Sequence, residues 1–193
     1  MAVRRGRERE LRVMSISIPR DMVWTLIVFI AVNLTLYLIL LPLFPEGLLD
    51  QPYTFKVAFA VDMVLNFSVG VCVLLPTRRP AFMALGGLLT VLVDLDHSLS
   101  LLGFTAPSRP NHSLLFLTLL IIALLLTVRK LEYVFTACAA FFAQLTMDIT
   151  NFPLLYPLIP ARMEFPNPTM SLVWFTIALT FGFLAAIKMK GRP

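Results

Sequence analysis

The sequence predicts an all-α integral membrane protein with six transmembrane helices and both termini in the cytoplasm. Hydrophobic residues make up 59% of the 193 residues, charged residues make up only 14%, and the mean hydropathy is +0.86. These values lie outside the range of a soluble globular domain. The apolar residues gather into six long runs, and all but three of the 16 lysines and arginines fall on one side of these runs.

The six runs are assigned as transmembrane helices because a bilayer core requires about 20 apolar residues per helix. They cover residues 22–44, 55–75, 81–102, 113–128, 132–149 and 171–187. The fourth and fifth runs are short. Snorkelling of the basic residues at their ends, or local thinning of the bilayer, accommodates the difference in length. The expected organisation is a basic cytoplasmic tail (1–21), one transmembrane domain (22–187) and a basic cytoplasmic C-terminus (188–193).

The distribution of positive charge predicts the orientation, because cytoplasmic loops carry an excess of Lys and Arg. The predicted cytoplasmic side holds the tail, the C-terminus and the second-to-third and fourth-to-fifth loops, with Arg78, Arg79, Arg129 and Lys130 in the loops. The other side holds only Lys56, Arg109 and Arg162. This asymmetry accounts for the net charge of +5, so the bilayer and not a nucleic acid is the expected partner.

Four carboxylates lie inside or at the rims of the apolar runs: Asp62, Asp94, Asp96 and Asp148. Each costs roughly 2.5–3.5 kcal/mol at the centre of a transmembrane helix and less near its ends. No Lys or Arg within the same runs neutralises them. Protonation, a bound cation or a basic neighbour must balance their charge, so these residues indicate a functional site.

Helical spacing groups the polar residues, because residues three or four apart share a helix face. The pairs are Asp62 with Asn66, Asp94 with His97, and Gln144 with Asp148. His112 opens the fourth run on the same outer side, so we expect one pocket that opens outward. Imidazoles with carboxylates suit zinc, or manganese where oxygen ligands dominate.

Four short motifs occur together between residues 66 and 162, a stretch of about half of the chain. They are V-D-L-D-H (93–97), N-H-S (111–113), Q-L-T-M-D (144–148) and P-L-L-Y-P (153–157). In this combination the chain resembles the YdjM-like family of membrane-bound metal-dependent hydrolases. The family has histidines where this chain has Asn66 and Gln144, which implies a single metal ion or a degenerate, non-catalytic member.

The resemblance and the polar residues together imply a hydrolase in the cell membrane that acts on a lipid or phosphoester. The implied metal ligands are Asp94, His97, His112 and Asp148. Asp96 is the implied catalytic base, with the alternatives of a ligand or an orienter of His97. The implied substrate-binding residues are Asn66, Arg109 and Gln144, of which Arg109 suits an anionic head group.

Purely structural roles remain open as alternatives for several of these residues. Asn66 and Gln144 also suit interhelical hydrogen bonds, His112 an interfacial position, and Asp148 a helix end near water. At the level of function, the main alternative is a non-catalytic membrane subunit that docks a membrane protein partner. A proton or cation conduit through Asp62 and Asp94 is disfavoured, because the inner halves of the runs are almost wholly apolar.

Two further patterns carry little functional information. Cys72 and Cys138 lie inside apolar runs without a partner at metal-ligand spacing, so both are expected to be packing residues. Asn111 formally matches a glycosylation sequon on the outer side.

Overall fold

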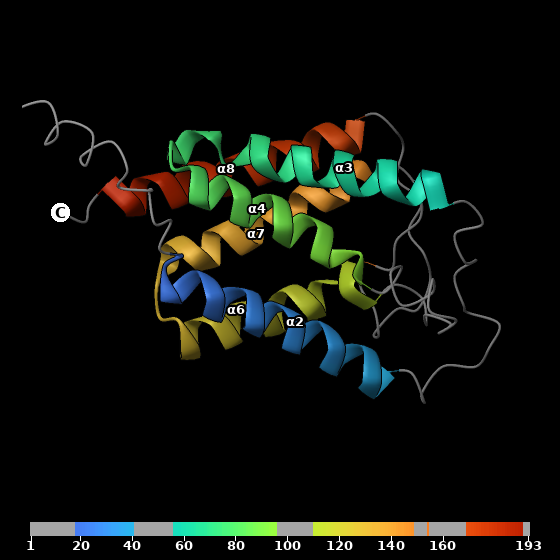
Figure 1. Ribbon diagram of the computed structural model, residues 1–193, viewed down its shortest axis with the longest axis horizontal. Helices are drawn as coiled ribbons and strands as arrows, with labels where there is room; N and C mark the ends of the chain where they lie inside the picture. The colour runs from blue at the N-terminus through green and yellow to red at the C-terminus, as the bar shows by residue number, and fades with distance from the viewer. Residues whose placement is uncertain (1–17, 41–55, 96–109, 149–153, 155–168, 191–193) are drawn as a thin grey trace, which may run out of the picture.

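The computed structural model describes residues 18–40, 56–95, 110–148, 154 and 169–190 (Figure 1). Within these ranges every regular element is helical, which confirms the all-α prediction. The α-helices are α2 (Arg20–Leu40), α3 (Lys56–Val73), α4 (Pro80–Val93), α6 (Leu114–Thr127), α7 (Leu131–Met147) and α8 (Thr169–Lys190). Two short 3-10 helices, η3 (Leu75–Thr77) and η4 (Pro110–His112), precede α4 and α6. Each predicted run overlaps one α-helix.

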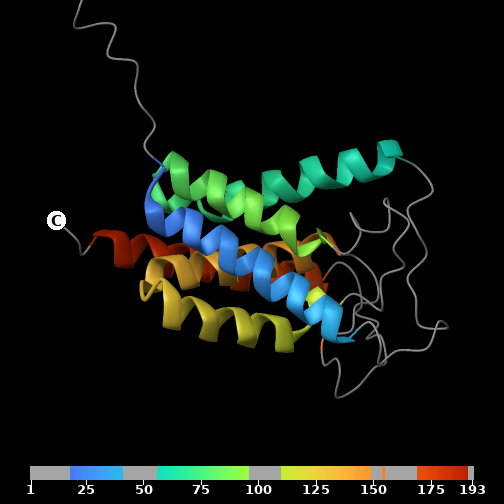
Figure 2. The same ribbon diagram turned by 60° about the horizontal axis from the view of Figure 1, so that its bottom comes forward.

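These six helices run alternately in opposite directions along the long axis of the bundle (Figures 1 and 2). One end holds the start of α2, the α3–η3–α4 connection, the α6–α7 connection and the end of α8. The other end holds the end of α4, η4, the end of α7 and the start of α8. We call the first the basic end, after Arg20, Arg78, Arg79, Arg129, Lys130, Lys188 and Lys190. We call the second the site end, after Asp94, His112 and Asp148.

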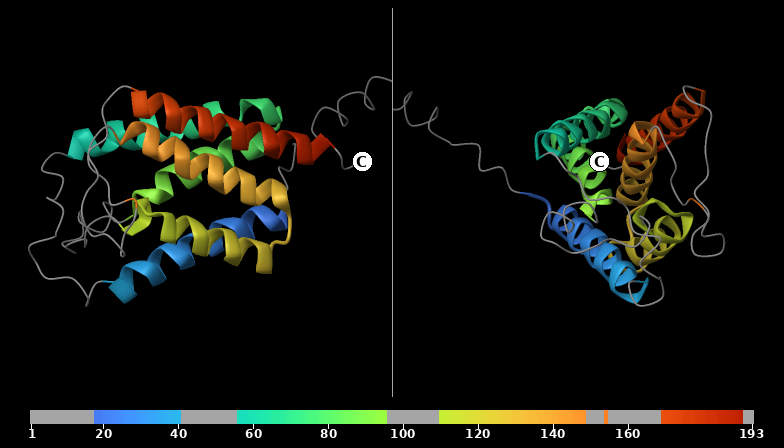
Figure 3. Two further views of the ribbon diagram at one scale, coloured as in Figure 1. Left: turned by 180° about the vertical axis from the view of Figure 1, so that it is seen from behind. Right: turned by 90° about the vertical axis from the view of Figure 1, so that its right-hand side faces the viewer.

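Helix α7 lies in the centre of the bundle and packs against α3, α4, α6 and α8 (Figure 3). Nearly all of its side chains from Glu132 to Leu145 are buried. Alanines on α7 allow close helix approach, while Phe142 stacks on Trp174 and Phe181 of α8 at ring-centroid distances of 5.8 Å. Helix α2 contacts α4, α6 and η4 at the periphery. Residues at the end of α7 are therefore surrounded by the ends of several other helices.

Local sequence explains several helix boundaries. Pro80 occupies the start of α4, where its missing N–H has no intrahelical role. Arg78 and Arg129 adopt positive φ angles of 53° and 57°, a conformation that commonly ends helical segments. Ser113 caps α6, because its hydroxyl oxygen accepts a hydrogen bond from the backbone N–H of Phe116 at 3.2 Å.

The prediction of an uninterrupted third helix over residues 81–102 is wrong. Helix α4 ends at Val93, and Asp94 is its C-cap residue in a turn. The backbone N–H of Asp94 donates to the carbonyl of Val91 at 3.1 Å, a three-residue spacing that tightens the last turn. His97, the other residue of the spacing argument, lies outside the described residues, so its pairing with Asp94 on one helix face stays a prediction.

Glycines bring α3 into close contact with α4 and α8. A Cβ atom added at Gly70 would lie 2.6 Å from the carbonyl oxygen of Gly86 on α4. A Cβ atom added at Gly182 of α8 would lie 1.9 Å from the carbonyl oxygen of Val73. Backbone approach this close requires residues without a side chain. It fixes α3 beside α4, and so places Asn66 near the end of α4.

The outer surface of the described bundle is largely apolar, whereas part of its interior is polar. Leu38, Val64, Leu126 and Leu172 are each more than 60% exposed. Cys138 is buried as expected of a packing residue, but Cys72 is exposed on α3, so that expectation is wrong for Cys72. Large apolar side chains on this scale face a partner or a lipid phase in folded proteins.

Helix length gives weaker support for membrane spans. Of the helices in the described ranges, α8 alone is long and apolar enough to cross a membrane by length and composition. The apolar segments Ala60–Val73, Pro80–Val93, Leu114–Thr127 and Leu131–Met147 are shorter. The 14 residues of α4, or of α6, extend about 21 Å at 1.5 Å per residue, against a hydrocarbon core of roughly 30 Å. Helix length alone therefore does not support six spans.

Candidate metal centre

Asp94 is the residue directly after the last residue of α4, and it is buried at the site end of the bundle. Its side chain is only 1% exposed. Its Oδ2 accepts hydrogen bonds from the amide of Asn66 on α3 at 2.8 Å and from the amide of Gln144 on α7 at 2.5 Å. Its Oδ1 lies 3.0 Å from Nε2 of His112. Four elements, α3, α4, η4 and α7, therefore meet at one buried carboxylate.

His112 is the last residue of η4 and is fully buried. The residues that follow it hold it in place. Ser113 caps α6 and donates its hydroxyl to the carbonyl of Pro110 at 2.6 Å. The backbone N–H of Leu114 donates to the carbonyl of Leu154 at 2.9 Å, which satisfies one of the free donors in the first turn of α6. The residue after the N-H-S motif, Leu114, thus contacts Leu154 of the P-L-L-Y-P motif.

Asp148 is the C-cap residue of α7, and its backbone N–H donates to the carbonyl of Gln144 at 3.1 Å. Its side chain is 14% exposed, and its Oδ2 lies 2.9 Å from Nε2 of His112. Asp94 is almost fully enclosed, so Asp148 is the more accessible of the two carboxylates.

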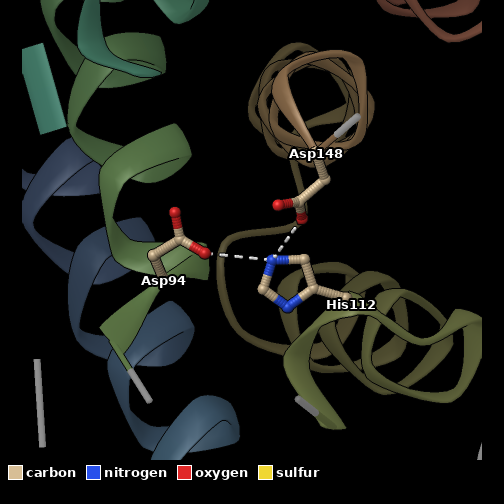
Figure 4. A group of neighbouring side chains, drawn as sticks. All are labelled: Asp94, His112 and Asp148. Carbon is tan, nitrogen blue, oxygen red and sulfur yellow. Dashed lines mark ion pairs between the residues drawn. The ribbon is translucent and has the colours of Figure 1, made fainter. Parts of the chain in front are cut away.

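Both carboxylates approach the same nitrogen of the imidazole (Figure 4). One ring N–H carries one hydrogen, so it forms a well-aligned hydrogen bond with only one carboxylate at a time. One ligand atom from each residue lies within 4.8 Å of the other two. Bonds of 2.0–2.2 Å to a tetrahedral zinc ion place ligand atoms about 3.4 Å apart. The observed distances from Nε2 differ from that value by only about half an ångström.

The charges of these side chains suit a divalent cation. If both carboxylates are ionised and the imidazole is neutral, the group carries two negative charges inside a bundle whose buried residues are mainly apolar. A divalent cation balances these charges, whereas a proton on the imidazole balances only one. Buried charge is tolerated where it is paired or coordinates a metal. Three protein ligands are also the number that catalytic zinc sites use when they leave a fourth position open for water.

Asn66 and Gln144 contribute amide groups beside Asp94. Through their N–H groups they form interhelical hydrogen bonds, which was the alternative to a substrate-binding role. Among the residues that the structure describes, the side-chain oxygens Asn66 Oδ1 and Gln144 Oε1 are buried and lack a hydrogen-bond partner. Rotation of an amide exchanges its oxygen and nitrogen. Such a rotation would replace a hydrogen bond to Asp94 Oδ2 with a contact between two oxygens, so it requires a cation between them. An oxygen ligand of this kind suits manganese better than zinc.

Three residues proposed from the sequence lie outside the described ranges, namely Asp96, His97 and Arg109. Their roles as base, metal ligand and head-group binder remain predictions. Asp62 is half-buried on α3 and does not belong to the three-residue group formed by Asp94, His112 and Asp148.

Sequence reasoning missed a second polar contact at the site end. Asn33 of α2 is 1% exposed, donates to the carbonyl of Leu92 at 2.8 Å, and accepts a hydrogen bond from the amide of Asn111 at 2.7 Å. A lone Asn in the apolar run of α2 was the available signal. Asn111 is fully buried, so its sequon match does not describe a residue accessible for glycosylation.

Comparison with known proteins identifies no relatives. No protein-family model matches the chain, and neither a curated protein nor a solved structure does so. The resemblance to YdjM-like hydrolases therefore remains a prediction from four motifs.

Proposed function

We propose that the chain is a membrane-embedded hydrolase that depends on one Zn²⁺ or Mn²⁺ ion held by Asp94, His112 and Asp148. One observation supports this proposal: two carboxylates and an imidazole from three separate elements meet at the site end. One ligand atom of each side chain lies within 4.8 Å of a ligand atom of the other two. Such an ion polarises an ester or phosphoryl oxygen and activates a water molecule. The more exposed side chain of Asp148 marks the side from which a lipid or phosphoester substrate approaches.

The remaining predicted residues have supporting roles in this proposal. Asn66 and Gln144 hold the carboxylate of Asp94 and offer amide groups to a polar head group. Asp96 acts as base, His97 adds a nitrogen ligand, and Arg109 binds an anionic head group.

We also propose that the six helices lie in the cell membrane with the basic end in the cytoplasm. All seven lysines and arginines whose side chains are described belong to the basic end, where Lys130 pairs with Asp21. Such an excess is typical of cytoplasmic loops. The apolar outer surface suits lipid. Short helices such as α4 and α6 are accommodated by local bilayer thinning, with the site end near the outer interface.

Cysteine labelling tests this orientation in a background that carries Cys72→Ser and Cys138→Ala. Arg79→Cys lies at the basic end and Thr169→Cys at the opposite end, and both positions are exposed. A membrane-impermeant maleimide added to intact cells is expected to label only the cysteine at position 169. The cysteine at position 79 should react after the membrane is permeabilised. Labelling of both positions from the same side would contradict the topology.

The metal-dependent activity is tested on protein purified in mild detergent without chelators. Elemental analysis is expected to find about one zinc or manganese ion per chain. The metal-loaded protein should hydrolyse bis(4-nitrophenyl) phosphate or a fluorogenic phospholipid, and chelation should remove the activity. A folded protein that binds neither ion at micromolar concentrations would exclude the hydrolase.

A non-catalytic membrane subunit is the second candidate, and one observation favours it. The hydrogen bonds from Asn66 and Gln144 to Asp94, with the contacts of His112, already connect the polar side chains without an ion. A connected polar network of this kind links four elements and favours one arrangement of the bundle. In this case the apolar outer surface would include a docking site for another membrane protein.

Gln144→His distinguishes the two candidates. The amide nitrogen of Gln144 is 2.5 Å from Asp94 Oδ2, so an imidazole at this position adds a nitrogen ligand one turn before Asp148. We expect zinc affinity, measured by competition with a chromogenic chelator, to rise at least about tenfold, or 1.4 kcal/mol. Gln144→Leu is the control, because it removes the same hydrogen bond without adding a ligand. Equal, negligible metal binding by both variants and the wild type would favour the subunit.

A further inference from the structure

We propose that Asn33 is a positioning residue that holds Asp94 and His112 at the separation needed to share one ion. This inference rests on the proposed metal site and extends it to a helix that supplies no ligand. Helix α2 meets the site end through its contacts with α4 and η4.

Asn33 connects the two segments that carry Asp94 and His112. Its amide nitrogen donates to the carbonyl of Leu92, two residues before Asp94, at 2.8 Å. Its oxygen accepts from the amide of Asn111, the residue before His112, at 2.7 Å. Both asparagines are buried. One side chain thus joins the end of α4 to η4, beside the 3.0 Å contact between Asp94 and His112.

The physical role of this bridge follows from the two segments that it joins. The carbonyl of Leu92 belongs to the last turn of α4, where backbone carbonyls commonly accept hydrogen bonds from groups outside the helix. His112 is carried by η4, a single 3-10 turn whose geometry is set by its neighbours. A metal site tolerates displacements of only about 0.5 Å, so losing the bridge should change how well the ligands fit an ion.

Helix α2 offers its own matched control. Thr25 is also a fully buried polar residue of α2, but its hydroxyl donates to the carbonyl of Asp21 within the same helix. It lies near the basic end, at the start of the helix. Asn33→Leu and Thr25→Val therefore both remove one buried polar side chain from α2, and only the first touches the bridge.

The test combines a metal-free and a metal-bound measurement. The sequence contains two histidines, so ¹⁵N spectra of imidazole-labelled protein are simple, and a His97→Ala background leaves only His112. In the metal-free protein, Asn33→Leu is expected to shift or broaden the His112 ring signals, whereas Thr25→Val leaves them unchanged. In protein that retains His97, Asn33→Leu should weaken Zn²⁺ or Mn²⁺ binding 10–100-fold, as loss of a residue that supports ligands does.

The outcomes separate this inference from the proposed function. Wild-type protein that binds no metal contradicts the function, and the His112 signals then decide alone whether Asn33 positions the ring. Wild-type metal binding with unchanged affinity and unchanged signals in Asn33→Leu overturns the positioning role. If Asn33→Leu does not fold, Asn33→Ser replaces it, because a serine hydroxyl bonds to its own helix and is too short for the bridge. The same two results are then expected from Asn33→Ser, and their absence overturns the inference.

Discussion

Replacing His112 with alanine is expected to abolish binding of Zn²⁺ or Mn²⁺ at micromolar concentrations. The substitution removes the only nitrogen ligand in the described group and leaves the carboxylates of Asp94 and Asp148 facing each other across the vacated space. Loss of a residue that merely supports a ligand costs 10–100-fold in metal affinity, so loss of a ligand should cost more than about 100-fold. Isothermal titration with Zn²⁺ and elemental analysis of the purified variant measure this effect.

Glu132→Gln is the control for His112→Ala. Glu132 is buried in the first turn of α7, at the basic end, so its substitution also changes a buried ionisable side chain but leaves the site end intact. It should keep the metal affinity of the wild type. His97→Ala, made alongside, reports whether the second histidine contributes a ligand. A His112→Ala protein that still binds one ion per chain with wild-type affinity would exclude the site.

Asp94→Leu is expected to produce the largest loss of stability together with complete loss of metal binding. Asp94 accepts hydrogen bonds from Asn66 and Gln144 and contacts His112. Leucine has the same number of side-chain heavy atoms but accepts no hydrogen bond. Each interhelical hydrogen bond inside a membrane protein contributes about 0.6 kcal/mol on average, and breaking a buried charged pair costs 3–5 kcal/mol. Between these limits, we expect the free energy of unfolding to fall by about 2–4 kcal/mol.

The loss is measured as the change in unfolding free energy in mixed detergent micelles with increasing dodecyl sulfate. Asn66→Leu and Gln144→Leu are matched variants that each remove one donor to Asp94, and each should cost about 0.6 kcal/mol. Their sum should fall below the cost of Asp94→Leu, because the aspartate also loses His112. An unfolding free energy of Asp94→Leu equal to that of the wild type would show that the polar network does not stabilise the bundle.

Most of the secondary structure could be predicted from the sequence, because helix formation in apolar runs depends on local composition. Each of the six predicted runs overlaps a described helix, and His112 ends η4, two residues before the start of α6. The break at Asp94 was not predictable in this way. The run that precedes it, 81–93, is apolar and favours a continuous helix, whereas the carboxylate is bound by Asn66 and Gln144, 28 and 50 residues away.

The sequence by itself determined that the described part of the chain is helical, and that Asp94, His112 and Asp148 are unusual residues in an apolar chain. Both properties depend on local sequence, because hydrophobic runs favour helices and a charged side chain in such a run has a high free energy of insertion into a membrane. The placement of most positive charge on one side of a membrane stays a prediction. Only the tertiary structure decided which polar side chains meet. Asn33 and Asn111 are 78 residues apart, and their contact depends on how α2 packs against α4 and η4. Packing of this kind is set by side-chain shape and close backbone approach, such as that of Gly70 to Gly86, which hydropathy and helical spacing do not encode.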